Sequence, residues 1–138
     1  MATTTPSALD PGRERLVRAA IAALGLLSLA IGAFMAISPS AFFDAIGPFG
    51  RFNDHYVRDM STWQLGFGAA MLVAVGRAGW RRPLVAVGAV QAGLHVVNHL
   101  IDVGDSHPAW VGVFDVVTLA GSLALFAWLW LTTAEADR

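Results

Sequence analysis

The stretch "QAGLHVVNHLIDVGDSHPAWVGVFDVV", Gln91–Val117, decides the fold of this chain. Its first half is apolar but carries an amide and two histidines, and after the short turn "GDSHP" a second apolar run carries one aspartate, Asp115. Because the turn is short, the two runs are predicted to form antiparallel neighbouring helices. The sequence thus predicts an apolar helical hairpin with polar groups near its turn.

The composition of the whole chain places this hairpin in a membrane. Of 138 residues, 56% are hydrophobic and 14% charged, whereas soluble proteins have roughly 45–50% and 25%. A soluble fold of this size would expose too much apolar surface. The net charge of −1 argues against a nucleic-acid partner. The absence of cysteine excludes disulfides and thiolate chemistry.

Four segments approach the roughly 20 apolar residues that a membrane-spanning helix needs. The predicted spans are residues 16–37, 61–75 (beginning nearer Tyr56), 83–103 and 109–132. The first also resembles a signal peptide, but its apolar core is longer than a typical one, so we expect an uncleaved helix. The predicted fold class is therefore all-α, a polytopic membrane four-helix bundle.

The predicted domain comprises residues 15–133, between a disordered cytoplasmic tail (1–14) and a second cytoplasmic tail (134–138). Between the first two spans, "SPSAFFDAIGP" predicts a short helix that lies in the membrane interface, because Ser40 can cap it and its phenylalanines form an apolar face.

Arginines in the short loops predict the orientation of the bundle. Three precede the first span and three lie between the second and third, whereas the opposite side holds only Arg51 and Arg58. The positive-inside rule then places both termini in the cytoplasm. The same orientation gives an inner aromatic belt of Trp80, Trp128 and Trp130 and an outer one of Trp63 and Trp110.

Small residues recur in the first two spans and predict close packing of their backbones. They are Gly25, Ser28 and Gly32 in the first span and Gly66, Gly68, Ala69 and Ala70 in the second.

Four polar residues of the third span share one helical stripe, since Gln91, His95, Asn98 and Asp102 are spaced four, three and four apart. His99 lies on a neighbouring line. Polar groups at membrane depth must turn toward the bundle interior or a water-filled cavity. Asp115 on the fourth span reaches a similar depth, so the outer half of the bundle is predicted to hold a polar pocket.

The metal hypothesis for this pocket rests on HxxxH, which places two imidazoles on one helix face. With carboxylates from neighbouring helices, these residues would suit zinc or iron. The predicted metal ligands are His95, His99, Asp115 and Asp59. The zinc-protease and di-iron motifs are absent. Haem is less favoured, because histidines four apart on one helix cannot reach both faces of a porphyrin.

Further roles in the pocket are predicted for other residues. The candidates for ligand binding are Gln91, Asn98, Asp102, Thr62 and His55. The candidates for catalysis are His95, Asp115, Asp59 and Arg58.

Three functions stay open at this point. The pocket binds a metal ion or small polar ligand, with the chain as an accessory subunit of a membrane complex or a homo-oligomer. Alternatively, a histidine–aspartate pair performs acid–base chemistry on a lipid or quinone. Alternatively, the polar groups only tie the helices together.

The segment "NDHYVRD", Asn53–Asp59, has two interpretations of its own. In the first, it forms a rim of the pocket, and Arg58 binds an anion. In the second, it is a solvated loop that caps the second span, and Arg58 pairs with Asp54 or Asp59.

The layout resembles the small four-helix bacterial membrane proteins grouped as DoxX-like or DUF4345-like. The similarity rests on "SPSAFFDAIGP" after the first span, on "VRDMSTWQLGFGAAML", on the arginine turn "GRAGWRRP" and on "HVVNHLID". The resemblance covers most of the chain from Leu16 onward. It implies a multi-pass protein of the bacterial cytoplasmic membrane, surrounded by lipid, with some members linked to oxidoreductase or quinone-associated complexes.

Overall fold

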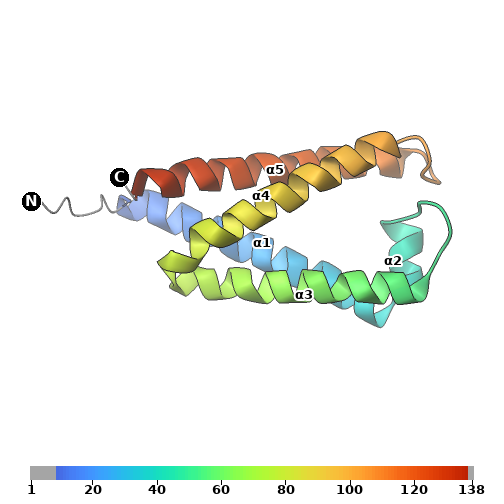
Figure 1. Ribbon diagram of the computed structural model, residues 1–138, viewed down its shortest axis with the longest axis horizontal. Helices are drawn as coiled ribbons and strands as arrows, with labels where there is room; N and C mark the ends of the chain where they lie inside the picture. The colour runs from blue at the N-terminus through green and yellow to red at the C-terminus, as the bar shows by residue number, and fades with distance from the viewer. Residues whose placement is uncertain (1–8, 137–138) are drawn as a thin grey trace, which may run out of the picture.

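A computed structural model describes residues 9–136, and every regular element among them is a helix. In chain order these are α1 (Pro11–Ile37), α2 (Pro39–Ala45), α3 (Asp54–Gly76), α4 (Ala78–Ile101) and α5 (Trp110–Ala136). The predicted all-α class and the short helix after the first long one are confirmed. Figure 1 shows four long helices side by side, with α2 set across one end.

The long helices are arranged as two pairs. α1 packs along α3, and α4 packs along α5. Figure 1 shows the pairs close together at the end that carries both termini and further apart at the end near α2. We call these the inner end and the outer end.

Three of the described helices are long and apolar enough to cross a membrane: Pro11–Ile37, Ala78–Ile101 and Trp110–Ala134. The second predicted span, now α3, does not belong to this set, because charged and polar side chains crowd its first turns. Large apolar side chains face outward along the helices, for example Leu94 at 68% and Val117 at 64% exposed. Such surfaces suit a lipid bilayer.

Several helix ends differ from the prediction. α1 begins at Pro11, because the Asp10 carboxylate accepts the backbone N–H groups of Gly12 and Arg13 at 2.9 and 3.1 Å. Residues 11–14 are therefore helical and not part of a tail, while residues 1–8 of that predicted tail lie outside the described residues. α5 continues to Ala136, past the predicted end.

The short helix α2 also begins earlier than the prediction allowed. It starts at Pro39, directly after Ser38, so Ser40 lies inside its first turn and does not cap it. A proline at the first helical position suits a helix start, because its missing N–H would have no partner there.

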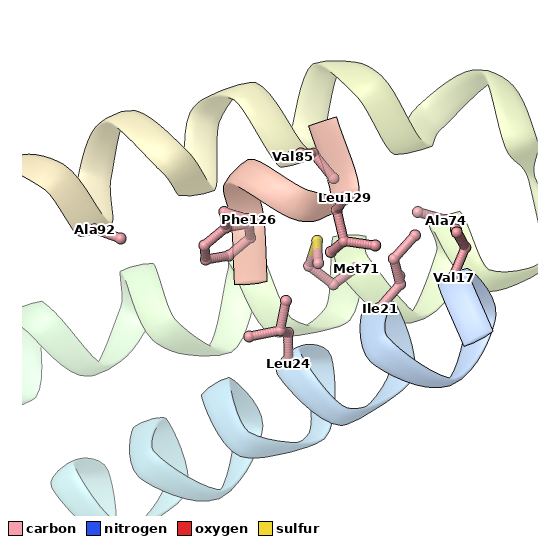
Figure 2. Close-up of a cluster of buried hydrophobic side chains, with 9 residues drawn as sticks. All are labelled: Val17, Ile21, Leu24, Met71, Ala74, Val85, Ala92, Phe126 and Leu129. Carbon is pink, nitrogen blue, oxygen red and sulfur yellow. The ribbon is translucent and has the colours of Figure 1, made fainter. Parts of the chain in front are cut away.

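The core joins all four long helices. Figure 2 shows its nine side chains: Val17, Ile21, Leu24, Met71, Ala74, Val85, Ala92, Phe126 and Leu129. Most of them gather toward the inner end, and Ala92 lies apart at the other edge of the cluster. Tight packing is therefore concentrated where the termini emerge.

Glycines let α1 and α3 approach closely. A Cβ atom at Gly68 would lie 2.8 Å from the Gly25 carbonyl oxygen, and one at Gly32 would lie 2.9 Å from the Leu65 side chain. The predicted close packing is confirmed at these three glycines. It does not extend to Gly66, where a Cβ would meet nothing within 4 Å.

Ser28 adds a polar link to the same interface. Its hydroxyl lies 3.0 Å from the backbone oxygen of Gln64 and 2.5 Å from the side-chain oxygen of that residue. An interhelical bond of this kind satisfies polar groups that lipid could not.

Candidate functional site

Two histidines on the outer half of α4 face each other. The Nε2 atoms of His95 and His99 are 3.1 Å apart, a hydrogen-bond distance. They lie four residues apart and therefore on the same face of the helix. One turn earlier, the Nε2 atom of Gln91 lies 3.4 Å from Nδ1 of His95. Three side chains of one helix thus form a continuous row of polar contacts.

Asp115 on α5 stands at the far end of this row. Its Oδ2 atom lies 3.8 Å from Nδ1 of His99, and the two side chains are only 9% and 13% exposed. Within the described part of the chain, neither of these two atoms has a hydrogen-bond partner. Leaving a buried polar atom unpaired costs about 1–3 kcal/mol. We call Gln91, His95, His99 and Asp115 the histidine cluster.

The donors and acceptors of the histidine cluster follow one order. An amide nitrogen only donates, so Gln91 makes Nδ1 of His95 an acceptor and leaves the hydrogen of His95 on Nε2. That hydrogen is donated to Nε2 of His99, whose own hydrogen is then on Nδ1. The Nδ1–H group of His99 faces the Asp115 carboxyl group.

Phe49 covers the histidine cluster from the outer end. Its ring meets His99 edge to face, with the ring centroids 5.0 Å apart. Figure 1 shows the segment between α2 and α3, which carries Phe49, reaching from α2 over the outer end of the bundle. The adjoining Pro48 is buried. No sequence pattern singled out Phe49, because its contact with His99 depends on the path of the segment between α2 and α3.

Asn98 does not share the buried face that its spacing predicted. It is exposed, whereas Ala92, His95 and His99 are buried or half-buried. At about 100° per residue, Asn98 lies about 60° to one side of His95, and His99 lies about 40° to the other. The buried face is centred on the His99 side, which turns Asn98 outward. Asp102, a further member of the predicted stripe, is half-buried at the end of α4.

The structure places the predicted residues of α3 in its exposed first turns. Oδ2 of Asp59 lies 3.4 Å from Nε2 of His55, and Arg58 pairs with Asp54 at 3.3 Å. The hydroxyl of Thr62 donates to the backbone oxygen of Asp59 at 2.7 Å. These contacts are local to α3 and do not involve the histidine cluster.

The N-terminal end of α3 follows the second interpretation of "NDHYVRD". The Asn53 side chain accepts the backbone N–H of Tyr56 at 3.2 Å and caps the helix. The ion pair of Arg58 with Asp54 is more than half exposed on both sides.

The metal hypothesis finds a smaller ligand set than predicted. Among residues 9–136, no group of three or more histidines or acidic residues is placed to hold a metal ion. Two imidazoles converge, but Asp115 approaches the opposite ring nitrogen of His99 from the one that faces His95. Asp115 is thus placed to orient His99 through Nδ1 and not to share a ligand sphere with Nε2.

A surface groove reaches one member of the histidine cluster, Gln91. It lies between α3 and α4, has a volume of about 570 Å³, and is lined by Met60, Trp63, Ala86, Val87, Val90, Gln91 and Leu94. A second groove of about 310 Å³ adjoins it and shares Trp63 and Val87. Gln91 thus lines the larger groove and is also the first member of the histidine cluster.

Comparison with known proteins gives no relative: no protein-family model, no curated protein and no solved structure matches the chain. The resemblance to DoxX-like proteins therefore stays a prediction, and the function is argued from the geometry.

Proposed function

We propose that this chain is a four-span membrane protein whose histidine cluster exchanges protons with a ligand bound in the outer half of the bundle. The observation that carries the proposal is the row of polar contacts from Gln91 through His95 to His99, which ends beside a buried carboxyl group. Histidine suits this task because each ring can accept a proton on one nitrogen and release one from the other.

One proton can cross the cluster in three balanced steps. A proton binds Nδ1 of His95 as the hydrogen bond from Gln91 is released. His95 then gives the hydrogen on its Nε2 to Nε2 of His99. When the 3.8 Å gap between His99 and Asp115 closes to a hydrogen bond, His99 gives the hydrogen on its Nδ1 to the Asp115 carboxylate. Each ring is neutral again and has exchanged one tautomer for the other. Phe49 keeps water from competing at His99.

A metal site is the second candidate, and the close approach of the two Nε2 atoms favours it. Zinc–nitrogen bonds of about 2.0–2.1 Å in a tetrahedral site put two ligand nitrogens about 3.3 Å apart. In that state both rings carry their hydrogens on Nδ1. The relay is better supported because it uses all four side chains, whereas a metal would need ligands beyond the two imidazoles.

The proton relay and the metal site require different histidine tautomers, and nitrogen NMR distinguishes them. With ¹⁵N-labelled histidine in lipid nanodiscs, we expect His95 to carry hydrogen on Nε2 and His99 on Nδ1. A scalar coupling across the bond between their Nε2 atoms would report the hydrogen bond directly. If both rings carry hydrogen on Nδ1 and the purified protein holds one zinc ion, the relay is wrong.

A change that travels along the row of contacts provides a second test of proton exchange. Replacing Asp115 with asparagine should change the ¹⁵N chemical shifts of both His95 and His99, although of these two rings only His99 faces Asp115. The matched control is Asp105→Asn, because Asp105 is exposed in the turn before α5. Unchanged ¹⁵N chemical shifts of His95 in the Asp115→Asn variant would show that no proton is shared along the row.

The proposal includes a membrane crossing by α3 and both termini in the cytoplasm. The 23 residues of α3 give a helix about 34 Å long, and α3 packs along α1, which is apolar enough to span. The arginines of the α3–α4 turn lie at the inner end beside the N-terminal helix, as the positive-inside rule favours. Membership of the DoxX-like proteins is part of the same proposal.

A further inference from the structure

The larger groove is lined by uncharged and mainly apolar side chains, and its polar groups are the amide of Gln91 and the indole N–H of Trp63. Its volume of about 570 Å³ lies in the range of about 300–1,000 Å³ that small-molecule sites occupy. An ion or a charged headgroup would find no counter-charge among the lining residues. Charge complementarity therefore favours an uncharged occupant.

The depth of Gln91 narrows the class of occupant. Gln91 lies ten residues before Ile101, the last residue of α4, and hence about 15 Å from the outer helix end at 1.5 Å per residue. The hydrocarbon of a bilayer is about 30 Å thick, so with Ile101 placed at its outer boundary this amide lies near its middle. Phospholipid headgroups stay at the interface and do not reach that depth. A ligand that bonds to Gln91 must carry its polar group into the membrane centre.

The Gln91 amide has hydrogen-bonding capacity left for such a ligand. An amide side chain offers two donors and an acceptor oxygen, and its contact with His95 uses one donor. Burial of the remaining groups in hydrocarbon is unfavourable unless they are paired. A carbonyl or hydroxyl group in the groove would pair them one hydrogen bond away from His95.

We infer that this groove binds an uncharged, lipid-soluble molecule with a carbonyl or hydroxyl group, held by a hydrogen bond to Gln91. The proton step on that molecule rests on the proposed function of the histidine cluster, but binding in the groove does not. The apolar body of the ligand lies along Trp63 and Val90, and its polar group faces the His95 end of the cluster.

Binding can be followed at Trp63, which lines the groove. Protein labelled with 5-fluorotryptophan in nanodiscs gives a fluorine NMR signal for Trp63, which the Trp63→Phe variant identifies. The probes are a long-chain methyl ketone and an alkane of equal length. We expect the ketone to shift the Trp63 signal saturably. A hydrogen bond of about 0.5–1.5 kcal/mol corresponds to an affinity about two- to thirteenfold above that of the alkane.

Three variants sharpen the test. Gln91→Met keeps the size of the side chain and should remove the preference for the ketone. Val90→Phe should block both probes by filling the groove, whereas Val97→Phe, on the exposed surface outside the groove, should leave binding unchanged. His99→Ala should also leave binding unchanged, so a failed relay and a failed site are distinguishable.

Two outcomes would overturn the inference. One is equal binding of ketone and alkane in both the natural protein and Gln91→Met, which would make the groove an ordinary lipid contact. The other is a Trp63 signal that depends on protein concentration and not on the probe, which would show that a second copy of the chain covers the groove.

Discussion

Arg81 donates to both carboxylate oxygens of Glu14, at 2.8 Å each. Its Nε and Nη2 atoms also reach the backbone oxygens of Ala74 and Val75, both at 3.1 Å, near the end of α3. The arginine side chain is 9% exposed and the glutamate 36%. One residue of α4 thus holds α1 and the end of α3 together and satisfies helix carbonyls that would otherwise lack partners.

Replacing Arg81 with methionine should lower the free energy of unfolding by about 2–3 kcal/mol, because it leaves a carboxylate and two carbonyl oxygens without their donor. Unfolding by sodium dodecyl sulfate in mixed micelles, followed by circular dichroism, measures this. Arg77→Met is the control, since Arg77 is exposed in the same turn and its loss changes the turn's charge equally. Equal effects of the two substitutions would assign the loss to charge alone.

Gly68→Ala should be costly and Gly66→Ala should not. A Cβ at Gly68 meets backbone atoms of α1 under 3.0 Å, which forces the two helices apart, whereas one at Gly66 meets nothing. Overpacking of this kind costs about 1–3 kcal/mol. The same micelle unfolding assay compares the pair. Similar stabilities for the two variants would mean that α1 and α3 do not approach as closely as described.

Ser106→Ala should weaken the start of α5. The hydroxyl of this fully buried serine accepts the backbone N–H of Gly112 at 2.9 Å. Loss of such a capping bond costs about 1–2 kcal/mol. Ser40→Ala is the control, because Ser40 is exposed and caps nothing. Amide hydrogen exchange should accelerate in the first turn of α5 in the Ser106 variant alone.

Diethyl pyrocarbonate should modify the exposed histidines faster than His99. His55 and His107 are exposed, whereas His99 is buried beneath Phe49. Mass spectrometry should therefore find the first two modified at least tenfold faster. Phe49→Ala should accelerate the modification of His99 and leave His55 unchanged. Rapid modification of His99 in the natural protein would show that Phe49 does not cover it.

The crossing by α3 can be tested with introduced cysteines, because the chain has none of its own. Ala41→Cys and Gly104→Cys should react with an impermeant maleimide added to the outside of intact cells. Gly79→Cys should react only in inverted vesicles. All three sites are exposed. If Ala41→Cys and Gly79→Cys label from the same side, α3 does not span the membrane.

The sequence predicted the long helices and the proximity of α4 to α5 because these depend on local signals. Apolar runs mark helices of membrane length, and the short turn before Pro108 leaves antiparallel packing as the simple solution. The contact of His95 with His99 follows equally from helical spacing. The approach of Asp115 to His99 follows from counting residues on either side of the turn between α4 and α5.

The predictions that failed concern rotation and long connections. Spacing cannot say which side of His95 faces the bundle, so Asn98 was assigned to the wrong face. The rotation of α3 decided that Gln64 bonds to α1 and that Asp59 remains outside with His55. Ser106 could have been found, since a serine shortly before an apolar run is a known helix-start signal. The contact of Phe49 had no such signal.

Most of the core shown in Figure 2, apart from Ala92, lies with the ion pair of Arg81 at the inner end, away from the histidines. The main packing contacts and the histidine cluster therefore lie at opposite ends of one small bundle. Substitutions around His95 leave the packing at the inner end intact. Their effects on ligand binding or proton exchange can therefore be separated from effects on folding. New ligand preferences could likewise be engineered into the α3–α4 groove without rebuilding the scaffold beneath it.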